Sequence, residues 1–318
     1  MSIKNNTVLA VVIIASLLIT ACSNEMEPAE PKQDRPTVAL IMKSLANEFF
    51  VNMANGAEQH QLQHADQYQL IVNGLKDESD LTQQVSLIEQ MTARGVDIIV
   101  IAPADSKALI PSIKRAVSSG IIVVNIDNKL DSMLLTEAAI SVPFVGPDNR
   151  EGARLAGDYL AEKLSQGDDV AIIGGISTAF NAAQRQLGFE DAMSAAGANV
   201  IGTQAGNWEQ AKASTVAAAM ISENPNLKAI LCSNDNMAIG AIAAVRQSGK
   251  TGSIQVIGFD NISATHELLK NGELLATVDQ YGDQLAIYGI EYALQILRDG
   301  IVPSDRKTAV SLITATDL

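Results

Sequence analysis

Three apolar runs in this 318-residue chain stop at side chains that can grip hydroxyl groups. The run 229–232 is followed by Asn234, the run 256–258 by Asp260, and an earlier run ends at Asp127. In an open parallel sheet, ligands bind in the crevice beyond the carboxyl ends of the strands. Carboxylates accept hydrogen bonds, and amides both donate and accept them. The pattern therefore predicts two half-sheets that face each other across a site for a polar, hydroxylated ligand.

The elements that must position these residues alternate between strand and helix, which is typical of parallel sheets covered on both faces. Expected strands are 37–42, 69–73, 97–101 and 121–126, then 170–173, 200–204, 229–232 and 254–258. Expected helices are 48–67, 80–94, 106–119, 182–196, 209–222, 237–247 and 265–271. Asp80 is the expected N-cap of the second helix and Gly95 its stop, and Asp148 is a further N-cap candidate. Late elements are a strand at 275–279, a helix at 283–298 and a strand at 310–313. Two such series predict two α/β lobes.

The amino terminus indicates export. A helix needs about 20 apolar residues to span a bilayer, and the apolar stretch 8–19 is shorter than that. Such a short stretch is typical of a signal peptide. Residues 19–22, Ile-Thr-Ala-Cys, resemble a bacterial lipobox, which implies cleavage before Cys22 and its lipidation. The alternative is an ordinary signal peptide that contains a cysteine. We expect a lipoprotein signal peptide at 1–22 and a flexible tether, rich in proline and charge, at 23–36.

Composition limits the class of partner. The formal net charge is −14, whereas nucleic-acid binding requires a basic footprint, so we expect no nucleic-acid partner. Hydrophobic residues make up 47% of the chain, enough for one large or two medium α/β domains. The chain has two cysteines; if Cys22 is lipidated, Cys232 has no disulfide partner, and its place at the end of an apolar strand predicts a buried side chain.

Aromatic side chains are few, at 4% of the chain, so those near the strand ends are informative. Phe49 and Phe50 open a helix after the first strand, and the single tryptophan, Trp208, lies in a polar loop that opens another. Flat rings can stack on the apolar C–H faces of a polyhydroxylated ligand. Alternatively, Trp208 packs at its helix start and one of the two phenylalanines belongs to the core.

Polar side chains supply the rest of the predicted site. The candidates are Asn47, Asp127, Arg185, Asn234, Asp260 and Gln280. Asp127 would accept hydrogen bonds from hydroxyls, and Arg185 would donate in a forked geometry. Alternatively, an acid at a strand end is a helix N-cap, a role that suits Asp235 better than Asn234, and Gln280 is a hinge residue.

Over nearly all of residues 37–315 the chain resembles the ribose-type sugar-binding proteins of bacterial ABC importers, which are type I periplasmic binding proteins. The segments that carry this resemblance are ALIMKSLANEFF at 39–50, IDN at 126–128, QRQLGF at 184–189, NW at 207–208, ND at 234–235, GFD at 258–260 and VDQ at 278–280. It implies two Rossmann-like lobes with parallel sheets, joined by a three-strand hinge that closes around a sugar.

The resemblance also implies how the chain divides between the lobes. The N-terminal lobe would comprise residues 37–146 and 281–309. The C-terminal lobe would comprise residues 147–280 and 310–318. The chain would then cross between lobes near Gly146, near Gln280 and near Ala309.

Two expected ligand residues depart from the ribose binders. Asn128 stands where they carry an arginine, and Lys43 where they carry a small hydroxyl residue. We hypothesise that Lys43 replaces the missing cation, so that the site keeps two carboxylates and two cations; alternatively, Lys43 points to solvent. An ammonium is a point donor, whereas a guanidinium is a planar fork. We therefore expect the ligand of this site to carry its hydroxyl groups in a different arrangement from ribose.

Three functions compete. The leading one is a monomeric, lipid-anchored receptor that delivers a monosaccharide or small polyol to an ABC permease. It would lie in the periplasm, or on the outer face of the cell membrane in a Gram-positive cell. The second is a signalling receptor for a sugar or autoinducer, with the same fold and no transport. The third, an enzyme, needs an acid/base pair with perturbed pKa values. Asp127 and Asp260 are the evident candidates, and neighbouring cations should keep both ionised, so we expect no catalysis and no cofactor.

Two weaker motifs are set aside. His60 and His64 stand four residues apart, a spacing that can bind zinc, but no further ligand accompanies them, so we expect no metal site. Residues 174–178 follow a strand as a phosphate loop does, but they lack the Gly-Lys-Ser/Thr ending.

Overall fold

The computed structural model describes residues 35–318. The expected signal peptide, Cys22 and most of the expected tether therefore lie outside the described residues. In the described part, no helix has the length and apolar character to cross a membrane.

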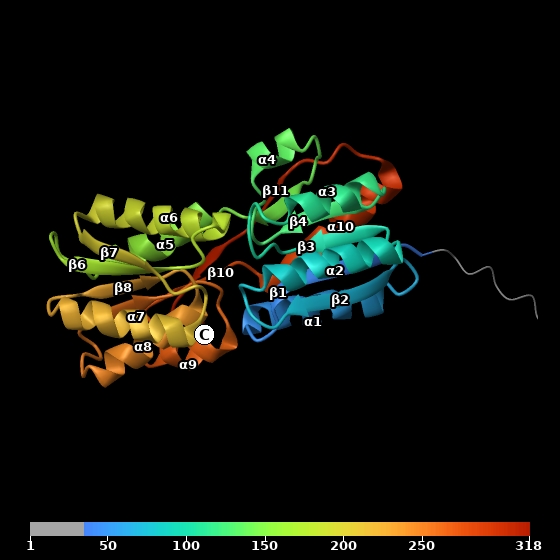
Figure 1. Cartoon of the computed structure of the whole chain (residues 1–318). Helices are drawn as coiled ribbons and strands as arrows, with labels where there is room; N and C mark the ends of the chain where they lie inside the picture. Colours follow the sequence, from blue (N-terminus) through green and yellow to red (C-terminus); the bar gives the residue numbers. More distant parts are fainter. Residues whose placement is uncertain (1–34) are drawn as a thin grey trace, which may run out of the picture. The chain divides into compact units, whose positions relative to one another are not determined.

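The first lobe is built on a six-stranded sheet in which every neighbouring pair of strands is parallel (Figure 1). In spatial order its strands are β2 (Gln69–Leu75), β1 (Thr37–Ser44), β3 (Ile98–Ile101), β4 (Ile122–Ile126), β5 (Phe144–Pro147) and β11 (Arg306–Thr308). Its helices are α1 (Glu48–Gln63), α2 (Leu81–Arg94), α3 (Ile110–Ser118), α4 (Ser132–Glu137) and α10 (Gly282–Asp299).

Both faces of this sheet are covered because alternate residues of a strand point to opposite sides. In β1, Val38 and Leu40 pack with the buried side chains of α1 and α10. Ala39 and Ile41 pack on the other face with α2 and α3. The strand is apolar on both faces, as expected for a buried parallel sheet.

The second lobe repeats the arrangement with a four-stranded parallel sheet. Its spatial order is β7 (Asn199–Ala205), β6 (Asp169–Gly174), β8 (Ala229–Cys232) and β9 (Gln255–Ile257). A short antiparallel pair, β10 (Thr277–Asp279) and β12 (Ser311–Ile313), lies beside it through a bridge from Ile257 to Ala276. Helices α5 (Asn149–Ala161) and α6 (Phe180–Ala196) cover one face, and α7 (Gln210–Glu223), α8 (Asp235–Gln247) and α9 (His266–Lys270) cover the other.

Successive elements change lobe at three places. β5 is followed by α5, β10 by α10, and β11 by β12, and each pair belongs to different lobes (Figure 1). These changes fall where the hinge was expected. The exact lobe boundaries stay a prediction.

Most of the expected elements are present, and their caps explain where they begin. Asp80 accepts a hydrogen bond from Gln83 N at 2.9 Å, and Asp148 accepts one from Glu151 N at 3.1 Å, so both predicted N-caps are confirmed. Gly95 ends α2 with a φ of 71°, a conformation that suits glycine. Cys232 is fully buried, as predicted, and burial raises the pKa of its thiol.

Two predicted helix boundaries are wrong. α1 ends at Gln63 and not at residue 67, because the chain turns there to bury Tyr68, whose hydroxyl bonds His60 Nδ1 at 2.8 Å. α3 begins at Ile110 and not at residue 106, because Asp105 Oδ1 accepts from the backbone N–H groups of residues 107 and 108 and holds a turn there.

Candidate functional site

Ten of the eleven predicted ligand residues line one small cavity between the lobes. It contains about 240 Å³ not occupied by protein atoms. The lining residues are Lys43, Asn47, Phe49, Phe50, Glu78, Asp127, Asn181, Arg185, Trp208, Asn234, Asp260 and Gln280. Part of this space is open to solvent, and residues of both lobes enclose the rest.

The carboxyl ends of strands in both sheets bring these residues together. Lys43 is the penultimate residue of β1, and Asp127 directly follows β4 in the first sheet. Asn234 and Asp260 follow β8 and β9 in the second. In both lobes, polar residues at the ends of parallel strands therefore gather at one site, as the topology of such sheets requires.

Unusual backbone conformations occur at three of the lining residues. The φ angles of Asp127, Trp208 and Asp260 are 60°, 69° and 121°, a region that non-glycine residues rarely adopt. Such strain persists where surrounding structure over-determines it, often at binding sites. Gly175 gives the indole its room, since a Cβ there would lie 2.1 Å from the Trp208 ring.

An ion pair occupies the first-lobe side of the cavity. Lys43 Nζ lies 2.8 Å from Asp127 Oδ2, and the two side chains are 4% and 3% exposed. The same ammonium lies 5.5 Å from the ring centroid of Phe50 and 5.7 Å from that of Trp208. Lys43 therefore lies inside the cavity, and the alternative that it points to solvent is wrong.

Arg185 occupies the second-lobe side and is held by several partners. Its Nε donates to Asn149 Oδ1 at 2.7 Å, and its Nη1 donates to the Ser233 carbonyl at 2.8 Å. Nη1 also lies 3.5 Å from Asp260 Oδ1, and the guanidinium stacks 3.7 Å from the Phe259 ring centroid. These contacts fix the plane of the fork before any ligand arrives.

Burial has the largest effect on the pKa values of Asp260 and Arg185. Desolvation raises the pKa of Asp260 well above its usual value, and Arg185 offsets only part of the rise. Desolvation likewise lowers the pKa of Arg185. The cation expected beside Asp260 is therefore present as Arg185, and it acts against the rise in the pKa of this carboxyl. Further donors, such as Gln280 Nε2 at 2.7 Å from Asp260 Oδ1, favour the carboxylate.

Two lining residues, Glu78 and Asn181, were not predicted. Glu78 is 5% exposed and accepts from Asn47 Nδ2 at 3.1 Å. Burial raises its pKa to about 7, an effect that Lys43 partly offsets. Glu78 stands three residues after the end of β2, so its place near a strand end was the signal that the sequence offered. Asn181 lies one helical turn before Arg185 on α6.

Besides Asp127 Oδ2, which forms an ion pair with Lys43, five buried polar atoms of lining residues have no hydrogen-bond partner within residues 35–318. They are the donors Arg185 Nη2 and Trp208 Nε1, and the acceptors Glu78 Oε2, Asn181 Oδ1 and Gln280 Oε1. Unpaired buried polar atoms cost about 1–3 kcal/mol each, so a ligand that satisfies them gains affinity. A hydroxyl both donates and accepts, and it fits this mixed set.

Asn128 is the predicted ligand residue that does not line the cavity. It is fully buried, and both ends of its amide are used by the protein. Nδ2 donates to the Pro103 carbonyl at 2.9 Å, while Oδ1 accepts from Ser106 Oγ at 3.3 Å and from Asn181 N at 3.2 Å. The departure from arginine at this position therefore removes a side chain from the cavity.

The assignment of the α8 cap to Asp235 is wrong. Asn234 is the N-cap, and its Oδ1 accepts from Met237 N at 2.9 Å. Asp235 is the first helical residue and is fully buried. Its carboxylate accepts from Thr277 Oγ1 at 2.7 Å and from Ile262 N at 3.0 Å, which ties β10 to α8 behind the cavity.

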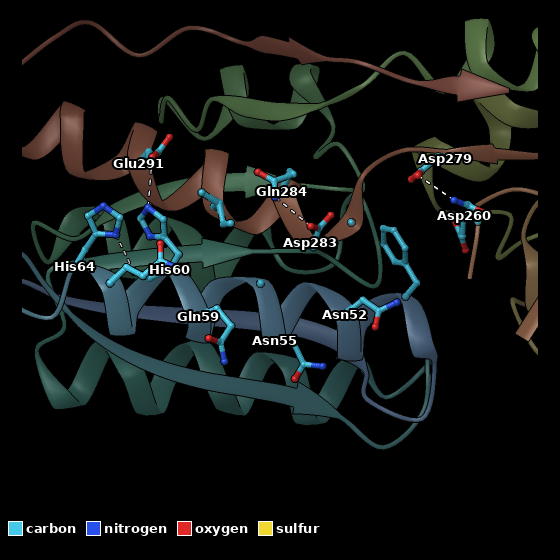
Figure 2. A pocket seen from close by; sticks show the side chains of 16 residues that line it. Asn52, Asn55, Gln59, His60, His64, Asp260, Asp279, Asp283, Gln284 and Glu291 are labelled. Atoms are coloured by element: carbon cyan, nitrogen blue, oxygen red, sulfur yellow. Dashed lines mark hydrogen bonds and ion pairs between the residues drawn. The ribbon is translucent and has the colours of Figure 1, made fainter. Parts of the chain in front are cut away.

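A larger hollow lies between α1 and α10 (Figure 2). It measures about 1490 Å³, part of which is open solvent, and amides such as Asn55 and Gln59 line its α1 side. At one end His60 Nε2 lies 3.4 Å from Glu291 Oε1. No group of three His, Cys, Asp or Glu residues in the described chain is placed to hold a metal ion. The smaller cavity, with its buried ion pairs and unpaired atoms, is the better candidate site.

Comparison with known proteins identifies the family. The profile of a family described as the periplasmic binding protein domain matches residues 38–300. The chain belongs to this family of periplasmic binding proteins. The predicted fold class, α/β with parallel sheets in two lobes, is thereby confirmed.

Similar periplasmic binding proteins are known from several bacteria. A protein from Pseudomonas aeruginosa named D-ribose/D-allose-binding protein is 49% identical over 95% of this chain and 97% of its own length. An ABC transporter solute-binding protein from Burkholderia multivorans, solved with an unknown ligand interpreted as α-D-erythrofuranose, is 54% identical. It has a TM-score of 0.87 and covers 88% of this chain and 99% of its own. One from Actinobacillus succinogenes with bound D-allose is 34% identical, with a TM-score of 0.84 and coverage of 89% and 99%.

Proposed function

We propose that this periplasmic binding protein captures a monosaccharide in the cavity between its lobes and delivers it to an ABC permease. The five unpaired buried atoms carry the proposal, because they present donors and acceptors together in a space of about 240 Å³. Phe49, Phe50 and Trp208 add apolar faces at the same cavity, and the rings of Phe49 and Phe50 meet edge to face at 5.1 Å. That combination matches the hydroxyl rim and C–H faces of one sugar ring.

Among monosaccharides, we propose D-allose as the preferred ligand, with D-ribose second. The relative from Pseudomonas aeruginosa is named for both sugars, and the relative from Actinobacillus succinogenes was solved with D-allose. Lys43 and Glu78 add a point donor and an unpaired acceptor to the first-lobe wall. These groups favour a hydroxyl pattern that differs from the one read by an arginine fork.

Capture would follow from the division of the site between two lobes. An open form exposes the aromatic rings, and a sugar that bonds both walls shifts the population toward the closed form. The carboxylates and cations hold the ligand and have no group arranged to exchange protons with it, so we propose no catalytic step. The named relatives are likewise binding proteins.

We further propose that the protein works in the periplasm as a monomer and is anchored to a membrane through a lipid on Cys22. The lipobox-like residues 19–22 and the tether-like composition of residues 23–36 support this. The membrane subunits of the permease would then meet the closed pair of lobes.

Thermal unfolding of the polypeptide Ser23–Leu318 tests the sugar assignment. The protein is first unfolded, dialysed and refolded to remove any bound ligand, and is then heated with pentoses, hexoses, deoxysugars and polyols. D-Allose at about 1,000 times its Kd should add roughly 4 kcal/mol, which raises Tm by several degrees. Sucrose, which is too large for the cavity, is the negative control. A Tm that no monosaccharide or polyol moves would contradict the proposal.

A further inference from the structure

Four helical segments of the second lobe, α6, α7, α9 and the short 3₁₀ helix η1 (Ser263–Thr265), begin without a capping side chain of their own, and two of them start beside the first lobe. Of these two, α6 follows Ala179 and η1 follows Ile262; neither residue makes a side-chain cap bond. The first backbone N–H groups of a helix have no partner within it and need an acceptor from elsewhere. Both starts lie at the rim of the cleft between the lobes.

The first lobe supplies the acceptors for α6. Ser106 Oγ accepts from Phe180 N at 2.9 Å, and Asn128 Oδ1 accepts from Asn181 N at 3.2 Å. Both acceptors are buried and already oriented within their own lobe, because Ser106 Oγ donates to Asn128 Oδ1 and Asn128 Nδ2 donates to Pro103 O. A cap that is normally local is here made between lobes.

The first lobe also supplies the acceptor for η1, at the other rim. Glu48 Oε1 accepts from Ser263 N at 2.8 Å, and Oε2 accepts from Ala264 N at 3.4 Å. Partial burial acts to raise the pKa of Glu48, but the hydrogen bonds from these two residues outweigh it and the pKa is lowered. A carboxylate at this place also suits the positive end of a helical segment.

We propose that Glu48, Ser106 and Asn128 are positioning residues that hold the lobes closed by capping second-lobe helices across the cleft, and that they set ligand affinity without touching the ligand. None of the three lines the cavity. When the lobes open, the capped N–H groups turn to water, so the caps act on the balance between open and closed forms. Apparent affinity scales with the closed fraction. The inference rests on the proposed capture of a sugar. It assigns Asn128, which does not line the cavity, the role of capping α6 from the first lobe.

Glu48→Ala tests one rim, with Glu58→Ala as the matched control. Both residues are on α1, and Glu58 is exposed on the same helix. Calorimetric Kd values are measured for D-allose and D-ribose. Because a cap contributes about 1 kcal/mol, Glu48→Ala should weaken both sugars by about fivefold and leave their affinity ratio unchanged. A Kd equal to that of Glu58→Ala would overturn the proposal, and so would a changed ratio, which indicates direct contact with the ligand.

Ala179→Ser tests the other rim in the opposite sense. A serine at this position caps α6 within its own lobe in the open and closed forms alike, so closure gains less. We expect the Tm of the ligand-free protein to stay level or rise while sugar affinity falls by about twofold to fivefold. If serine leaves the affinity unchanged or tightens binding, α6 does not depend on the first lobe for its cap.

The two proposals fail separately. If the wild-type protein binds no sugar of the panel, the proposed function fails. Small-angle X-ray scattering of the ligand-free proteins then tests whether the caps hold the lobes closed. A larger radius of gyration for Glu48→Ala than for wild type and Glu58→Ala supports them. Equal radii for the three proteins contradict them.

Discussion

At the scale of residues, the charges of the cavity occur as opposed pairs that are almost completely buried. Lys43 with Asp127 and Arg185 with Asp260 face each other across the space that a ligand would fill. Buried ion pairs are weak contributors to stability, because desolvation offsets their attraction. Their value here lies in fixed donors and acceptors of charge-assisted hydrogen bonds, which are stronger than neutral ones.

Lys43→Met should damage both the fold and the site. The variant leaves the Asp127 carboxylate buried without its cation, which typically costs about 3–5 kcal/mol in the free energy of unfolding. Sugar affinity should fall, and the preference between D-allose and D-ribose should change. Urea unfolding and calorimetry measure the two effects, with Lys114→Met at an exposed position as control. Unchanged stability and preference would refute the assigned role of Lys43.

Glu78 should make stability depend on pH. Its folded pKa, about 7, lies above the usual 4.5, so the folded state holds a proton that the unfolded state has released between these values. Stability from the protonated form is therefore complete below pH 4.5 and is lost as pH rises through about 7. Glu78→Gln mimics the protonated form and lacks this loss.

Urea unfolding of wild type and Glu78→Gln at several pH values between 4 and 8 measures the difference. The two proteins should have similar free energies of unfolding near pH 4. Wild type should fall below the variant by up to about 3 kcal/mol at pH 8. Curves that stay parallel over this range would show that Glu78 is not desolvated as the structure describes.

At the scale of elements, the sequence predicted strands such as β1, β3 and β8 well, because they are apolar runs in buried parallel sheets. β11 escaped prediction because its three residues are mostly exposed and charged, with no apolar signal. α4 escaped because it buries none of its side chains. The late start of α3 depends on a turn at Asp105 that hydrophobic spacing does not show.

The same reasoning explains the candidate site. Ten of its residues could be predicted because they stand at strand ends or helix starts, where type and position agree. Glu78 was hidden in a charged run, and Asn128 was misplaced because residue type does not reveal which partners an amide has. Its partners Ser106 and Pro103 come from another loop, more than 20 residues earlier in the sequence.

The loop that presents Trp208 depends on the adjacent strand end. Gly175→Ala places a Cβ within 2.1 Å of the Trp208 ring, so the indole must move out of the cavity. Loss of an aromatic stacking partner should weaken sugar binding by about threefold to tenfold. Gly202→Ala is the matched control, since a Cβ there meets nothing within 4 Å. Calorimetry compares the two, and equal affinities would exclude the stacking role of Trp208.

At the scale of the whole molecule, residues 35–318 form two lobes whose facing walls share the candidate cavity. Each lobe is a covered parallel sheet, so each presents its strand ends as a rigid wall. Affinity then depends on two separate quantities: the contacts that the walls make with a sugar, and the stability of closure. The caps across the cleft act on the second quantity alone.

Sugar binding should therefore compact the molecule. Small-angle X-ray scattering of the ligand-stripped polypeptide Ser23–Leu318 should show a smaller radius of gyration with saturating D-allose than without it, because bonds to both walls favour the closed form. Sucrose serves as the control and should cause no change. A radius that D-allose leaves unaltered, despite binding, would mean that the lobes do not close around the ligand.

A crystal structure of the protein with D-allose tests the central claim most directly. The account predicts one sugar ring in the cavity, with its hydroxyls within hydrogen-bond distance of Arg185 Nη2, Trp208 Nε1 and Glu78 Oε2. Asn128 should make no contact with it. A sugar bound in the hollow between α1 and α10, or a sugar in the cavity that leaves these three atoms unpaired, would contradict the account (Figure 2).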